Sequence, residues 1–240
     1  MDSELMRRRV MMFDNDEDAG MFAYWDGADS LVSNQWRDRL NNIPIRIGSN
    51  TTHGDGYYTI TKTSNSTPVG YMQLQTDISS YIDYELVVRV VADIRAYSGY
   101  DVVPIVDFGA YGSAKWNYAF AAGIESTKNV YLGAKTSTNQ SLTIASTGNY
   151  AAWNGNDWNH DVVIDAGIFV TSNDKQRLFA RINGFETYAQ EANKVQLIPY
   201  YNSGQSAYCL FGLATAGASH MNAFRFQINV KSIKMYNIKK

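Results

Sequence analysis

Aromatic rings and amide groups occur together within residues 149–161, the segment NYAAWNGNDWNHD. In glycan-binding sites an aromatic ring stacks on the C–H groups of a sugar, while amide or carboxylate groups pair with its hydroxyls. The glycine and asparagine content predicts a loop, and loops carry binding residues more often than strands do. The glycan-contact candidates in this loop are Tyr150, Trp153, Asn154, Asn156, Asp157 and Trp158.

Two other functions of these rings stay open. Tyrosine and tryptophan side chains can close the end of a β-sandwich core, and they are also enriched in protein–protein interfaces. A second aromatic group, in residues 110–118 (AYGSAKWNY), contains Tyr111, Trp116 and Tyr118 and is open to the same alternatives.

Paired carboxylates are the other candidate for sugar chemistry. Retaining glycoside hydrolysis requires two carboxyl groups about 5–5.5 Å apart, and positions i and i+2 of a strand point to one face. Asp83 and Glu85 form the nearest such pair, and we expect them to be solvent-facing or strand-edge charges. Signatures of serine hydrolases, zinc proteases and P-loop enzymes are absent. We therefore predict no catalytic residues and no enzymatic activity, with a glycoside hydrolase as the least favoured alternative.

Metal sites have weak support in the sequence. Calcium requires several oxygen ligands, which residues 14–18 (DNDED) supply without the glycine and closing glutamate of an EF-hand. Asn154, Asn156 and Asp157 form a second oxygen-rich group. We predict no metal and no cofactor, and calcium is the alternative. The single cysteine, Cys209, lies in the apolar run AYCLFGLA and is expected in the core.

The composition of the chain excludes several classes of protein. The chain has 240 residues, 18% of them charged, and a net charge of −2, so nucleic acid is not an expected partner. Because no apolar run approaches about 18 residues, we expect no membrane insertion. The N-terminal residues lack the apolar region of a secretory signal peptide, so we expect synthesis and assembly in a reducing cytoplasm.

The elements that would position these residues are strands. Short runs rich in β-branched and aromatic residues follow one another from residue 21 onward, separated by Gly, Asn and Ser, as in a sandwich or barrel. Residues 83–97 form the longest early strand, and the only helical pattern is a turn around residues 34–40. Residues 178–184 (LFARING) predict a strand that enters an Asn-Gly hairpin turn.

The closing strand, residues 224–237 (FRFQINVKSIKMYN), contains a change of face. Its apolar residues occupy even positions through Val230 and odd positions at Ile233 and Met235. A strand of period two cannot change faces without an extra residue, so we predict a β-bulge near Lys231 and Ser232.

Residues 1–20 differ from the remainder of the chain. Ser3 is a suitable N-cap for a short helix through about Met12, and an arginine triplet precedes the acidic residues 14–18. The segment is either a disordered leader or a docking arm that orders on a protein partner. The arm residues proposed to dock are Leu5, Met6, Arg7, Arg8, Arg9, Val10 and Met12.

Together, LFARING, the glycine-centred strand CLFGLA and the closing IKMYN resemble the concanavalin A-like (laminin G-like) jelly-roll superfamily. Residues 23–47 also resemble the first part of related domains in phage virion proteins of gut bacteria. In those domains a Tyr-x-Asp-Gly turn precedes a Trp-x-Asp segment, here Trp36-Arg37-Asp38. The resemblance implies a two-sheet antiparallel jelly roll over residues 21–240 behind a docking arm of residues 1–20.

The resemblance also implies a function. It suggests a non-enzymatic bacteriophage virion protein, either a head or tail fibre or a decoration protein, made in the host cytoplasm and located in the virion. Its partners would be capsid, portal or tail proteins, further copies of the chain in a homo-oligomer, and host or mucosal glycans. The first alternative is a stand-alone carbohydrate-binding lectin.

Overall fold

A computed structural model describes most of the chain. The described residues are 20–48, 51–63, 72–74, 78, 80–81, 85–100, 102–110, 117–135, 141–189, 191–193, 207–211 and 225–237. The predicted docking arm, Leu5 to Met12, lies outside them, as do Asp83, Tyr111, Trp116 and the acidic residues 14–18.

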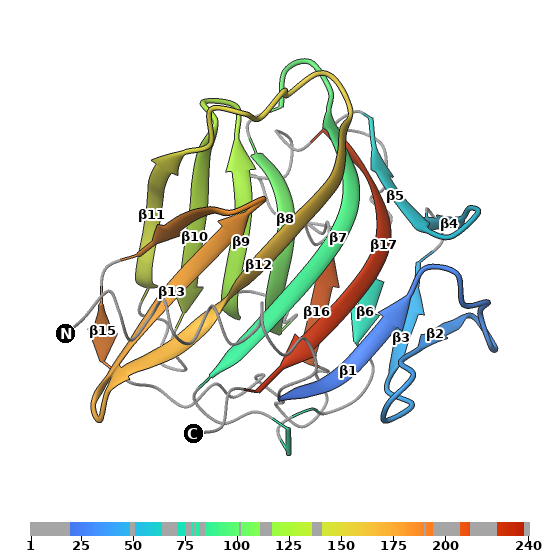
Figure 1. Cartoon of the computed structure of the whole chain (residues 1–240), viewed down its shortest axis with the longest axis horizontal. Helices are drawn as coiled ribbons and strands as arrows, with labels where there is room; N and C mark the ends of the chain where they lie inside the picture. Colours follow the sequence, from blue (N-terminus) through green and yellow to red (C-terminus); the bar gives the residue numbers. More distant parts are fainter. Residues whose placement is uncertain are drawn as a thin grey trace.

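Antiparallel strands form two sheets, which confirms the predicted all-β jelly-roll sandwich (Figure 1). The larger sheet has the order β14 (Phe185–Tyr188), β13 (Lys175–Ile182), β12 (Asn159–Ser172), β7 (Leu86–Ala96), β17 (Phe226–Tyr236), β5 (Tyr58–Lys62) and β4 (Thr51–His53), with β1 (Met21–Asp26) on β17 and β15 (Ala192–Asn193) on β13. The smaller sheet has the order β11 (Ser141–Asn149), β10 (Asn129–Lys135), β9 (Asn117–Glu125), β8 (Val102–Ala110), β16 (Ala207–Phe211), β6 (Met72–Leu74), β3 (Pro44–Ile47) and β2 (Gln35–Arg37). No helix long and apolar enough to cross a bilayer occurs in the described part of the chain.

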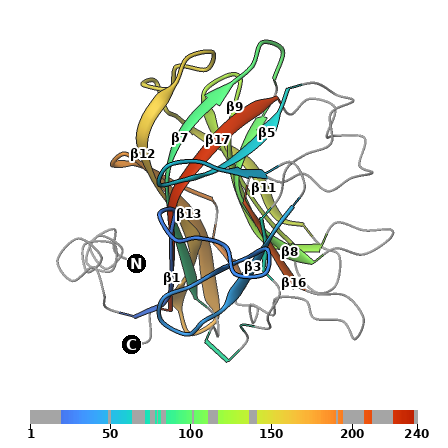
Figure 2. The same cartoon turned by 90° about the vertical axis from the view of Figure 1, so that its right-hand side faces the viewer.

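The core lies between the two sheets, which face each other in the edge-on view (Figure 2). On β7 the even-numbered residues from Leu86 to Ala96 point into the core, and the odd-numbered Arg89, Asp93 and Arg95 point to the outer face of the larger sheet. This alternation follows from the period-two pattern of the sequence. It places a row of charged side chains on one accessible face.

The predicted β-bulge in the closing strand is confirmed. The pairing of β17 with β7 shifts between Val230 and Ser232, where β17 also changes its second neighbour from β5 to β1. Lys231 is the extra residue, and its Nζ lies 2.7 Å from carboxylate oxygens of both Asp93 and Asp161. Asp161 belongs to a second register shift, in β12, so one lysine links two bulges across β7.

The predicted Asn-Gly hairpin is also confirmed. Asn183 and Gly184 join β13 to β14 with φ angles of 46° and 84°, the left-handed values that a two-residue turn requires. The Asn183 side chain also accepts a hydrogen bond from the Val163 backbone at 2.8 Å.

Two local expectations are wrong. The pattern at residues 34–40 is not a helical turn, because Gln35–Arg37 form β2 against β3. Glu85 lies at the strand edge, directly before β7, but it is buried and not solvent-facing, and its carboxylate accepts a hydrogen bond from the Val170 N–H at 2.7 Å. Both arrangements depend on partners from other strands, which leave no local signal in the sequence.

Gly167 of β12 yields a stability prediction. A Cβ atom there would lie 2.3 Å from the Leu86 carbonyl oxygen and 3.0 Å from the Val87 Cα, so β7 and β12 would have to separate. We expect Gly167→Ala to lower the free energy of unfolding by about 2 kcal/mol, measured by urea denaturation. Val163→Ala, at an exposed position of the same strand, should cost less than about 1 kcal/mol. Equal losses in the two variants would contradict this account of Gly167.

Candidate functional site

The loop that contains the glycan-contact candidates joins β11 to β12 and passes beside the end of β7, at the top of Figure 1. Asn159 fastens it, because its amide donates to the carbonyl oxygens of Asn154 at 2.8 Å and Ile94 at 3.2 Å and accepts from the Asn154 N–H at 3.0 Å. The Gly155 carbonyl accepts from the Ala96 N–H at 2.8 Å. These hydrogen bonds hold the loop in a fixed position at the edge of the larger sheet. Residues 154–158 and the end of β7 are called the ledge below.

Two of the candidate rings belong to the core side of this ledge. Trp153 is 1% exposed, and its Nε1 donates to the Tyr100 hydroxyl at 2.9 Å. Tyr150 is partly buried against Phe185, with ring centroids 5.7 Å apart. Trp153 thus closes the end of the sandwich and presents no ring face to a ligand. This corrects its selection as a sugar-stacking residue.

The other four candidates lie on the solvent side. Asn154, Asn156 and Asp157 are exposed, and the Asn154 amide donates to the Asp157 carboxylate at 3.0 Å. Trp158 is half-buried, and one of its neighbours is the Arg95 guanidinium, 4.7 Å from the ring centroid. The structure therefore brings amide, carboxylate and indole groups together at one accessible edge.

Three further residues of this site, Arg95, Tyr97 and Gln227, are not among those predicted from the sequence. Arg95 also stacks on Tyr97, 4.8 Å from that ring centroid, so its guanidinium has aromatic contacts on Tyr97 and Trp158. Its Nη2 donates to the Tyr97 hydroxyl at 2.9 Å and to the Gln227 side-chain oxygen at 2.8 Å. The available signal was that Arg95, on β7, and Tyr97, directly after β7, have the parity of the outer face. Their approach to Trp158 and Gln227 is a tertiary contact.

Metal ligation has no cluster to support it here. Among the residues that the structure describes, no three His, Cys, Asp or Glu side chains are arranged to hold an ion. In the Asn154–Asp157 pair the Asn154 amide nitrogen donates to the Asp157 carboxylate, so this pair is bonded within the loop.

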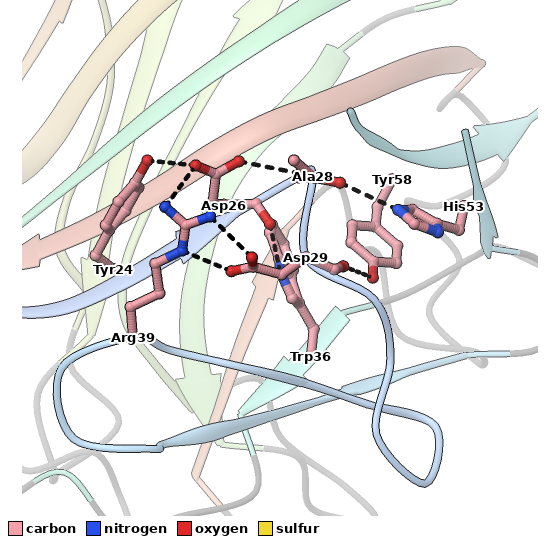
Figure 3. A network of polar contacts seen from close by, with 9 residues as sticks. Tyr24, Asp26, Ala28, Asp29, Trp36, Arg39, His53 and Tyr58 are labelled. Carbon is pink, nitrogen blue, oxygen red and sulfur yellow. Dashed lines mark hydrogen bonds and ion pairs between the residues drawn. The ribbon is translucent and has the colours of Figure 1, made fainter. Parts of the chain in front are cut away.

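A second polar cluster lies where β1 meets the β2–β3 hairpin (Figure 3). Arg39 is its centre: Nε and Nη2 each lie 2.8 Å from an Asp29 carboxylate oxygen, and Nη1 lies 3.0 Å from Asp26. Tyr24 donates its hydroxyl to Asp26 at 2.7 Å, and Tyr58 donates to the Asp29 backbone oxygen at 2.6 Å. One guanidinium thus bridges two carboxylates, and the hydroxyls of both tyrosines are also hydrogen-bonded within the cluster, which indicates a structural clasp.

The Trp36-Arg37-Asp38 segment serves the same clasp. The Trp36 indole donates to the Asp26 backbone oxygen at 2.9 Å, and both Trp36 and Asp38 are buried. The Asp38 carboxylate accepts from the N–H groups of Leu40, Asn41 and Ile43 at 2.5–3.0 Å, which shapes the hairpin turn. The Trp-x-Asp segment therefore has a folding role in this chain.

Because of the clasp, we expect the stability of the fold to decrease as the pH rises in the alkaline range. Burial, with the Asp26 hydrogen bond for Tyr24 and the Asp29 charge for Tyr58, raises each tyrosine pKa to about 12 from 10.0. The neutral phenol is therefore favoured in the folded state. Its contribution is complete below pH 10, the unfolded pKa, and is lost as the pH rises towards 12.

We expect the urea midpoint to fall as the pH rises from about 9 to about 11.5, and Tyr58→Phe to fall less steeply over that range. Tyrosinate absorbance would follow ionisation in the same samples. Parallel curves for Tyr58→Phe and the unmodified chain would show that Tyr58 does not carry this dependence.

The sequence matches no protein-family model and no curated protein. Solved structures do match. A Trypanosoma rangeli sialidase in complex with sialic acid aligns with 92% of this chain and 31% of its own, at TM-score 0.57 and 9% identity. A structure concerning botulinum neurotoxin type C, whose cell entry depends upon interaction with two ganglioside molecules, aligns with 93% of this chain and 49% of its own, at TM-score 0.55 and 12% identity.

These neighbours correct the prediction that the chain is not an enzyme. Trypanosoma rangeli sialidase itself aligns with 99% of this chain at 10% identity, so the fold occurs within enzyme chains. The chain spans about a third of the sialidases' length, 31–37%, and at these identities the likeness shows the fold alone. Neither the sialidases nor the neurotoxin structure links the chain to a phage. The chain thus has the β-sandwich jelly-roll fold that sialidases and a botulinum neurotoxin also contain.

Proposed function

We propose that this chain is a carbohydrate-binding β-sandwich domain. The ledge formed by residues 154–158 and the end of β7 is the binding site. One observation carries the proposal: Trp158 lies at an accessible edge with exposed amides of Asn154 and Asn156 on the same short loop. An aromatic platform with amide groups beside it is the arrangement that sugar rings and hydroxyls require.

The neighbours support the same function. The sialidase structure contains sialic acid, and the neurotoxin structure concerns gangliosides, so sugar ligands recur among proteins that share this fold. This proposal corresponds to the lectin alternative of the sequence analysis and replaces the virion role as the leading function. The phage origin, the virion partners, the homo-oligomer and the location in the virion stay predictions from the resemblance.

A glycan array probed with the full chain tests the proposal. We expect binding to at least one glycan class, and Trp158→Ala should weaken that binding at least tenfold, about 1.4 kcal/mol. Tyr57→Ala, which removes a partly exposed ring from the β4–β5 turn, is the matched control and should bind normally. Retained binding in Trp158→Ala would place the site elsewhere, and no binding by the unmodified chain would reject the function.

Enzymatic activity requires a separate assay, because the sialidase neighbours leave it open. Incubation of the full chain with a fluorogenic sialoside would detect turnover. Hydrolysis that survives Trp158→Ala would show an activity independent of the ledge.

A further inference from the structure

We infer that Arg95, held against the rings of Tyr97 and Trp158, receives the carboxylate of an acidic sugar. This inference rests on the proposed function and specifies the class of its ligand.

The first step is the charge of Arg95. Three other arginines of the described chain have carboxylate partners: Arg39 binds Asp26 and Asp29, and Arg89 and Arg181 share Asp165. Within the described residues Arg95 has none within 4 Å, and its hydrogen-bond partners, Tyr97 and Gln227, are neutral. Its positive charge is therefore not compensated by a protein carboxylate.

The second step is the hydrogen-bonding capacity of the guanidinium. Both hydrogen bonds of Arg95 come from Nη2, and Nη1 makes none in the described part of the chain. Nε is buried and also lacks a partner. A guanidinium N–H makes a strong, charge-assisted hydrogen bond to an anionic oxygen, so the unused Nη1 suits an anionic ligand group, while the buried Nε is out of its reach.

The third step is the fixed orientation of this group. Ring centroids of Tyr97 and Trp158 lie 4.8 and 4.7 Å from the guanidinium carbon, and Gln227 on β17 anchors Nη2. The arginine is thus ordered before a ligand arrives, which reduces the entropic cost of binding. The same indole that stacks on Arg95 is the platform of the proposed sugar site.

The acidic side chains of this face do not occupy Arg95. Asp93, two residues earlier on β7, is bound by Lys231 at 2.7 Å and lies 3.5 Å from His160. Asp161 is bound by the same lysine, and Asp157 accepts from Asn154. Each of these carboxylates has a partner other than Arg95, so Arg95 keeps an unused donor for an incoming carboxylate.

The experiment compares three ligands on the full chain by calorimetry: a sialic-acid-terminated oligosaccharide, its methyl ester, and the neutral oligosaccharide without the sialic acid. The ester keeps the shape of the sugar and removes its charge. We expect the acid to bind at least tenfold more tightly than the ester. Arg95→Gln should bring the acid down to the affinity of the ester, while Arg46→Gln, at an exposed arginine of the other sheet, should leave both unchanged.

Each outcome decides a different claim. Equal binding of acid and ester by the unmodified chain would overturn the inference and leave the glycan-binding function standing, and so would an equal weakening of both ligands in Arg95→Gln. Binding of no glycan would reject both proposals. The acid-to-ester ratio of the unmodified chain needs no variant, so the test holds even if Arg95→Gln folds poorly.

Discussion

Replacing Trp153 by alanine is expected to lower the free energy of unfolding by about 4 kcal/mol. The side chain is 1% exposed and packs into the end of the sandwich, so its removal leaves a cavity that the surrounding sheets cannot fill. The Tyr100 hydroxyl also loses the indole N–H that donates to it at 2.9 Å. Urea denaturation followed by circular dichroism would measure the loss without relying on tryptophan fluorescence.

Trp158 provides the matched control for this variant, because it lies in the same loop and is only half-buried. Trp158→Ala should cost less than about 1 kcal/mol while abolishing the proposed glycan contact. Within six residues of sequence, the two variants would then distinguish a tryptophan required for folding from one required for binding. Similar stability losses for both would mean that Trp158 is a core residue and that the ledge is not a binding platform.

The sequence does not predict which of these two tryptophans is buried. Both were selected because of the same surrounding residues, Asn, Gly and Asp. These residues predict a loop, but they do not show which of its side chains face the core and which face solvent. Burial of Trp153 depends on Tyr100, which reaches it from the turn after β7, and a Cβ at Gly155 would lie 2.5 Å from that tyrosine hydroxyl. Such contacts join distant segments and leave no local pattern.

The fold was more predictable than the site for a physical reason. Strand faces follow a period of two, and the Asn183-Gly184 turn follows from residues that tolerate positive φ, so both are local properties. Even the bulge at Lys231 could be predicted, because a change of apolar parity requires it. Arg95, by contrast, was recognisable only as an outward charge on a strand, since Trp158 approaches it from the loop before β12 and Gln227 from β17.

A second large loss of stability is expected when the buried charge of Asp165, on the outer face of the larger sheet, is removed. Asp165 has 4% of its side chain exposed and lies between two arginines: Arg89 Nε is 2.6 Å from one carboxylate oxygen, and Arg181 Nη2 is 2.7 Å from the other. We expect Asp165→Asn, which keeps the shape and removes the charge, to lower the free energy of unfolding by about 3 kcal/mol. The two arginines, 11% and 12% exposed, would lose the carboxylate that they share.

Asp161 on the same strand is the control that isolates burial. Its side chain is 79% exposed and pairs with Lys231 at 2.7 Å, so Asp161→Asn should cost less than about 1 kcal/mol, and added salt should reduce that cost further. The Asp165→Asn loss should change little with salt, because the side chains of the bridge are only 4–12% exposed. If both losses were small and both disappeared in salt, the Arg89–Asp165–Arg181 bridge would be a surface feature, and the stability of β7, β12 and β13 would have to come from their apolar face alone.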